Sequence, residues 1–116
     1  MKESDKYLKI VEWSEDDQCY IGHCPNLMMG GVHGEDEAKV YKELCEVVEE
    51  WIDIYKKDGE SLPIATAGKK YSGKFNLRVG EKLHEQLSLD ALRSGESLNS
   101  YCIKKLQEPM FNVDSR

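Results

Sequence analysis

The sequence lacks the features of membrane-spanning, exported and disulfide-bonded proteins. No apolar run approaches the roughly 18 residues that a membrane helix needs, and residues 1–6 lead into no hydrophobic signal region. The four cysteines are scattered and form no C-x-x-C pair, and there is no internal repeat. We therefore expect a cytoplasmic protein with reduced, mostly packing thiols and no association with a membrane.

Arginine is missing from the first half of the chain. Residues 1–68 contain 7 lysines against 16 acidic residues, a net charge of −9, whereas residues 69–116 contain 9 basic against 6 acidic residues, a net charge of +3. A chain of 116 residues forms one domain or two very small ones. The charge division suggests two parts with partners of opposite sign.

The first part of the chain predicts a small antiparallel sheet covered by one long helix. Residues 7–13 and 19–24 are rich in β-branched and aromatic side chains and form a hairpin across the polar turn 14–18, with a short third strand at 30–33. Apolar residues then recur at helical spacing after Asp36, a suitable N-cap, until Gly59 ends the helix. The expected fold class is α+β, with a first domain over residues 1–65.

Residues 66–72 are expected to form a linker to a second domain over residues 73–108, followed by a tail at 109–116. Residues 74–79 alternate strictly between polar and apolar side chains, which is typical of a strand. A helix follows and is closed by Gly95. A second helix begins after Ser97 as N-cap, and we expect Pro109 to stop it.

The second domain is too small to close a core alone. One strand and two helices over about 36 residues fall below the ~40 residues at which a lone domain usually needs oligomerisation. The apolar face of the strand, formed by Phe75, Leu77 and Val79, needs a second strand. A symmetric antiparallel pair from another copy supplies it, so the sequence predicts a homodimer or a higher homo-oligomer.

The second domain resembles the ribbon-helix-helix DNA-binding proteins of the Arc and MetJ type. The resemblance covers residues 73–107 and rests on Phe-Asn-Leu-Arg at 75–78 and Gly-x-Ser-Leu-Asn-Ser at 95–100. It implies that paired strands enter the major groove of an operator, with base contacts from Lys74, Asn76 and Arg78 and phosphate contacts from Ser97, Leu98, Asn99 and Ser100. Arg and Lys suit guanine edges and Asn suits adenine edges. The competing interpretation is an ordinary solvated strand face.

The first domain resembles the N-terminal domain of HicB antitoxins, a partial RNase H-like fold. The matching motifs are Cys-Tyr-Ile at 19–21, Pro-Asn-Leu at 25–27, Gly-Glu-Asp at 34–36 and residues 59–63. The resemblance implies an antitoxin that binds a small basic HicA-type mRNA-cleaving toxin through this domain and represses its own operon through the other. Part of the acidic field would come from the helix residues Glu46, Glu49, Glu50 and Asp53.

Enzyme and metal chemistry have weaker support in the sequence. The candidate carboxylates Glu12, Asp16, Asp17 and Glu46 do not converge as two-metal nuclease catalysis requires. Strand alternation separates Cys24 from Cys19 and His23, so these residues, with His33, predict neither a zinc site nor a Cys-His nucleophile. We expect a non-enzymatic protein without metal or cofactor. The alternatives are a stand-alone ribbon-helix-helix regulator whose first domain binds another protein or a small ligand, and a residual RNase H-like hydrolase.

Overall fold

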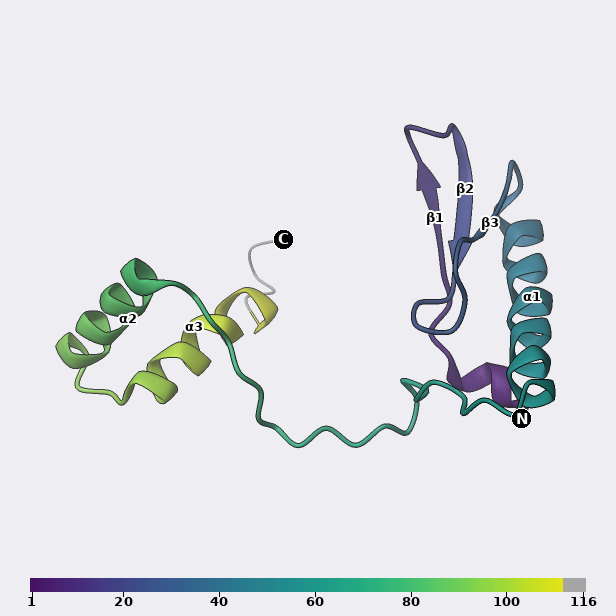
Figure 1. The fold of residues 1–116 in the computed structure, drawn as a ribbon. Helices are drawn as coiled ribbons and strands as arrows, with labels where there is room; N and C mark the ends of the chain where they lie inside the picture. Colours follow the sequence, from purple (N-terminus) through teal and green to yellow (C-terminus); the bar gives the residue numbers. More distant parts are fainter. Residues whose placement is uncertain (112–116) are drawn as a thin grey trace. The chain divides into compact units, whose positions relative to one another are not determined.

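A computed structural model describes residues 1–111 of the chain, which divides into two compact units (Figure 1). Unit 1 comprises Met1–Ser72 and unit 2 begins at Gly73. In the described residues the chain is α+β, with a three-stranded antiparallel sheet and three α-helices, as the sequence predicts. A single 3-10 turn, η1 (Glu3–Lys6), precedes the sheet.

The sheet of unit 1 has the predicted hairpin and third strand. Strands β1 (Ile10–Ser14), β2 (Cys19–His23) and β3 (Val32–Gly34) lie in the order β1-β2-β3, with every neighbour antiparallel. The first strand starts three residues later than predicted because Tyr7 turns its ring into the core and donates a hydrogen bond to the Pro63 carbonyl. A turn at Cys24, whose carbonyl accepts from the Leu27 and Met28 N–H groups, then leads towards β3.

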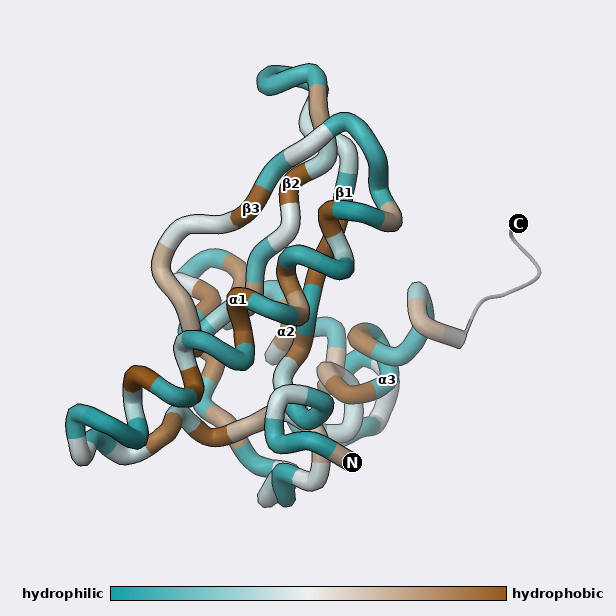
Figure 2. Tube along the Cα trace, turned by 90° about the vertical axis from the view of Figure 1, so that its right-hand side faces the viewer, coloured by the Kyte–Doolittle hydropathy of each residue, from teal (hydrophilic) through white to brown (hydrophobic). Residues whose placement is uncertain are grey.

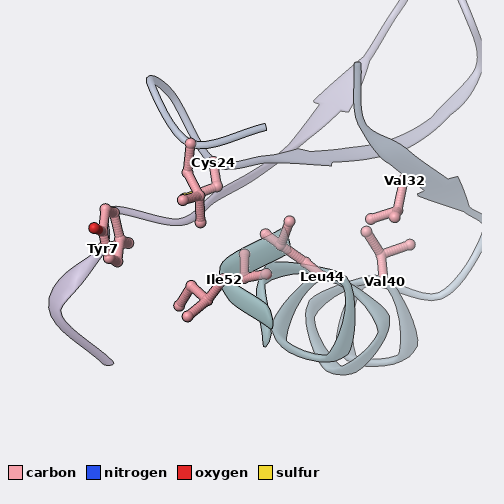
Figure 3. Close-up of a cluster of buried hydrophobic side chains, with 8 residues drawn as sticks. Tyr7, Cys24, Val32, Val40, Leu44 and Ile52 are labelled. Atoms are coloured by element: carbon pink, nitrogen blue, oxygen red, sulfur yellow. The ribbon is translucent and has the colours of Figure 1, made fainter. Parts of the chain in front are cut away.

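The long helix α1 (Glu37–Lys57) covers one face of this sheet. Asp36 is the predicted N-cap and accepts a hydrogen bond from the Lys39 N–H at 3.2 Å, and Gly59 adopts a φ of 69° just past the helix end. In Figure 2 hydrophobic residues recur among hydrophilic ones along α1, as amphipathic spacing requires. The side chains between sheet and helix form the core (Figure 3): Tyr7, Cys24, Leu27, Val32, Val40, Leu44, Val48 and Ile52.

Two glycines allow α1 to approach the sheet closely. A Cβ added at Gly22 would lie 3.1 Å from side-chain carbons of both Val32 and Val40, and one at Gly34 would lie 3.0 Å from Val40. Both glycines therefore face the helix. Because side chains alternate along a strand, Ile21 and its partner His33 lie on the other face of the sheet.

The chain after α1 returns along unit 1. Leu62 and Ala65 pack against the core, and the Ala67 N–H donates to the Lys6 carbonyl at 3.1 Å. Ala67 belongs to the segment that the sequence predicts as a linker, so this segment is attached to unit 1 at its first residues.

Unit 2 contains the two predicted helices, α2 (Glu81–Arg93) and α3 (Leu98–Phe111). Gly95, with a φ of 69°, follows the end of α2, and Ser97 caps α3 through its hydroxyl, which accepts from the Ser100 N–H at 3.1 Å. Gly80 precedes α2 at a φ of 87° and supplies no side-chain cap, which leaves this helix start weaker than that of α3.

One prediction about unit 2 is wrong, and another concerns a strand that requires a second copy. Residues 74–79 form no strand, because a strand requires a partner backbone and none lies beside this segment in the described chain. Pro109 does not stop α3, which runs on to Phe111. Proline removes one N–H near the end of the helix, where few further bonds depend on it. The predicted tail therefore begins in helix, and its residues 112–116 lie outside the described residues.

Candidate nucleic-acid and protein interfaces

Unit 2 has an apolar groove where its first segment meets the two helices. The groove has a volume of about 730 Å³. All three residues predicted as the dimer core contribute to it, and Phe75 and Leu77 remain 80% and 62% exposed. The helices contribute the apolar residues Leu87, Leu98, Cys102, Ile103 and Leu106.

Helix α3 also contributes to this surface, which the sequence did not predict. Leu98, Cys102 and Leu106 recur at intervals of four residues, which places them on one side of a helix. That spacing was visible in the sequence. It could not show that this side would face the 74–79 segment, because the direction of α3 depends on how it packs against α2.

The predicted base-contacting residues are all exposed in the single chain. Lys74 and Arg78 line the groove together with the apolar residues of this segment, whereas Asn76 does not. Of the three, Asn76 alone is thus separated from the apolar side chains in the single chain, because the segment has no strand hydrogen bonds that would fix the alternation. A second backbone is needed to fix these three side chains on one surface.

The start of α3 has the features of an anion site, formed by the N–H groups of Leu98 and Asn99. The Ser97 hydroxyl occupies the Ser100 N–H, so the first two helical N–H groups, those of Leu98 and Asn99, have no acceptor within residues 1–111. Such groups and the positive end of the helix dipole favour a phosphate. Close by, Glu96 forms an ion pair with Lys104 at 3.1 Å.

Acidic side chains dominate the surface of unit 1. Two of the four acidic helix residues singled out in the sequence, Glu46 and Glu49, lie on the same cavity as Lys2, and Glu49 pairs with Lys2 at 3.0 Å. The hydrogen bond from Lys2 to this carboxylate raises the pKa of Lys2. A second pair joins Lys56 to Glu3 at 2.8 Å. Both pairs are exposed and contribute little to stability, and each neutralises one carboxylate of this acidic surface.

The candidate carboxylates and thiols of unit 1 are dispersed. Glu12 lies on β1, opposite Ile21, whereas Asp17 lies in the hairpin turn, where it bonds Ser14. Cys24 is fully buried in the core, and burial raises the pKa of its thiol. Among residues 1–111 no three His, Cys, Asp or Glu side chains are arranged to hold a metal ion.

The aromatic residues Tyr20, Trp51 and Tyr55 pack against the core. The rings of Trp51 and Tyr55 lie 6.4 Å apart between centroids, and the Tyr55 hydroxyl donates to the Leu27 carbonyl at 3.4 Å. Their contacts are those of structural residues rather than of an open ligand site.

These observations define a class of protein: an acidic sheet-and-helix unit, followed by a short basic segment and a two-helix unit with an uncovered apolar groove. Residues 58–106 match the model of the HicB family. The match covers the end of unit 1 and unit 2 as far as Leu106, which is less than half of the chain, and it supports membership of the HicB family. No curated protein and no solved structure matches the chain. Within residues 1–111, the helices are too short or too polar to cross a membrane.

Proposed function

We propose that this chain is a HicB-type antitoxin acting in the cytoplasm. Unit 1 binds and neutralises a small basic HicA-type mRNA-cleaving toxin, and unit 2 represses the operon by binding double-stranded DNA as a ribbon-helix-helix dimer. The observation that carries the proposal is the family match over residues 58–106, which falls on a helix pair with a Ser97-capped second helix. In this proposal the protein has no catalytic role, and unit 1 is a reduced RNase H-like domain.

The exposed apolar surface of unit 2 supports the dimer. Among its described residues only Ala91 is a buried hydrophobic side chain. Large side chains are left exposed on the first segment and on both helices: Phe75, Leu77, Leu83, Leu89, Leu92, Ile103, Leu106 and Met110. A monomer of this size rarely leaves so much apolar surface in water. A second copy covers the groove and also provides the strand partner that residues 74–79 lack.

The DNA contacts follow from that pairing. Two antiparallel segments present Lys74, Asn76 and Arg78 from each copy on the face opposite Phe75, Leu77 and Val79. A two-stranded ribbon with these six polar side chains fits the major groove. The exposed N–H groups of Leu98 and Asn99, next to Ser97 and Ser100, hold a backbone phosphate and set the register.

Charge supports the toxin contact. Residues 1–68 carry a net charge of −9 and no arginine, which is complementary to a small basic protein. Complementary fields speed association and disfavour partners of the same sign. Glu50 and Asp53 are exposed on α1 and are available to such a partner.

The experiment that tests the DNA assignment is a titration of operator and scrambled duplexes at several salt concentrations. Asn76→Ala and Arg78→Ala should lose affinity for the operator alone, by ~1–3 kcal/mol for each good bidentate contact. Ser97→Ala should weaken both duplexes together, because phosphate contacts carry no sequence information. Unchanged operator preference in both ribbon variants, with the dimer intact, would remove base reading from this segment.

One observation keeps a second function under consideration. The family match begins at residue 58, so the sheet and all of α1 lie outside it. A stand-alone ribbon-helix-helix regulator, whose unit 1 binds another protein or a small ligand, has the same unit 2. A neighbouring gene for a small basic protein that inhibits growth unless this chain is co-expressed distinguishes the antitoxin from this alternative.

A further inference from the structure

The segment that joins the two units is basic and contains no acid. From Ser61 to Gly80 the sequence has four basic residues and no Asp or Glu. Two of these, Lys74 and Arg78, already belong to the proposed ribbon. The other two, Lys69 and Lys70, have no role in the function proposed above, although they contribute half of the positive charge of this stretch.

The structure leaves both ammonium groups accessible. Lys69 and Lys70 are exposed, and neither forms an ion pair with a carboxylate in residues 1–111. The Lys69 ammonium lies 5.0 Å from the centre of the Tyr71 ring, which is itself 72% exposed. Solvated lysines of this kind are free to exchange water and counterions for a polyanion.

Glycines flank residues 69–72 on both sides, and the backbone turns at each of them. Gly68 and Gly73 have φ angles of 79° and 84°, a region that other residues rarely adopt. Before Gly68, the Ala67 N–H is held by the Lys6 carbonyl. Lys69 to Ser72 thus form a short exposed arm, called here the basic arm, between two points where the backbone turns.

The chain itself keeps the basic arm close to the ribbon. Lys70 precedes Lys74 by four residues, so their Cα atoms are at most ~14 Å apart in an extended chain. Antiparallel pairing of two segments places their amino-terminal ends at opposite ends of the ribbon. The two arms of a dimer would therefore leave the ribbon on both sides, beyond the bases that Asn76 and Arg78 contact.

We propose that the basic arm binds the sugar-phosphate backbone of duplex DNA on either side of the ribbon, through Lys69 and Lys70 of each copy. The inference rests on the DNA binding proposed above and adds four phosphate contacts to each dimer. These contacts are independent of base sequence, since an ammonium group attracts any phosphate. The arm thus increases affinity without contributing to the choice of operator.

The test uses the full chain with Lys69→Gln and Lys70→Gln together. Loss of four phosphate contacts per dimer should reduce the slope of log K against log salt by about 3.6, because each contact contributes ~0.9 on B-DNA. Affinity should fall by the same factor on operator and scrambled duplexes. Both side chains are exposed and make no hydrogen bond to the described protein, so we expect the melting temperature to remain unchanged.

The matched control is Lys39→Gln with Lys42→Gln, which removes the same charge from exposed positions on α1. This variant should keep the wild-type slope. An unchanged slope in the arm variant, or a loss confined to the operator, would overturn the basic-arm proposal while leaving DNA binding in place. If the wild-type chain binds neither duplex at low salt, the proposed function fails as well.

Discussion

A single glycine, Gly31, lets the chain that enters β3 pass close to the backbone of β2. A Cβ at Gly31 would lie 2.6 Å from the backbone oxygen of Gly22, a distance that no side-chain rotation relieves. This contact fixes the path of the chain into β3. The turn at Cys24 leads the chain to that point, where only a residue without a side chain fits.

We expect Gly31→Ala to destabilise unit 1 by ~1–3 kcal/mol, the usual cost of overpacking, because backbone must move. Glu35→Ala changes an exposed residue of the following turn and should alter stability by no more than ~0.5 kcal/mol. Both tryptophans, Trp13 and Trp51, lie in unit 1, so urea unfolding followed by fluorescence reports this unit alone. Equal stability of the two variants would show that the loop relaxes around the added methyl group.

At the scale of elements, the 74–79 segment differs from the helices in where its backbone hydrogen-bond partners must come from. Helices α1 and α3 begin at residues whose side chains satisfy their own first turn, Asp36 and Ser97. The 74–79 segment has an alternating pattern but no such local partner, since strand hydrogen bonds join residues far apart or in another chain. A strand at this place therefore requires the second copy that the proposed dimer supplies.

Leu77→Glu should convert a dimer of the full chain to a monomer, because it places two carboxylates in the apolar interface. Asn76→Ala, one residue away on the opposite face, should leave the dimer intact. Sedimentation equilibrium at micromolar concentrations measures both, with tryptophan fluorescence as a check that unit 1 remains folded. A wild-type chain that sediments as a monomer of 13.3 kDa would contradict the dimer.

At the scale of the whole molecule, the proposed function divides toxin binding and DNA binding between the two units. The return segment extends unit 1 beyond residue 65, since Ala67 bonds Lys6 and Leu62 packs on the core. A fragment that retains these contacts has to include residues 66 and 67. Unit 2 has no comparable core in the described residues, where Ala91 is its one buried hydrophobic side chain.

We expect residues 1–72 to neutralise a co-expressed HicA-type toxin without repressing the operon, because the acidic field lies in unit 1 and the proposed DNA contacts lie in unit 2. The full chain with Leu77→Glu should behave in the same way. Growth of the toxin-expressing cells measures the first activity, and a reporter fused to the operon promoter measures the second. Loss of toxin neutralisation in a folded Leu77→Glu chain would show that unit 1 acts only as part of a dimer.

The sequence alone was sufficient for features that depend on neighbours a few residues away. The hairpin, the amphipathic stripe of α1, the caps at Asp36 and Ser97 and the glycine ends at Gly59 and Gly95 all arise from local spacing and backbone geometry. The site residues were chosen from alternation and resemblance, and their roles stay predictions.

Only the tertiary structure decided the features that depend on distant parts of the chain. It attached residues 62–67 to the core, placed Leu98, Cys102 and Leu106 beside the 74–79 segment, and left that segment without strand structure. In each case the deciding contact lies outside the local sequence window. A helix end depends on the next four residues, whereas a strand or a groove depends on whichever backbone or side chain packs against it.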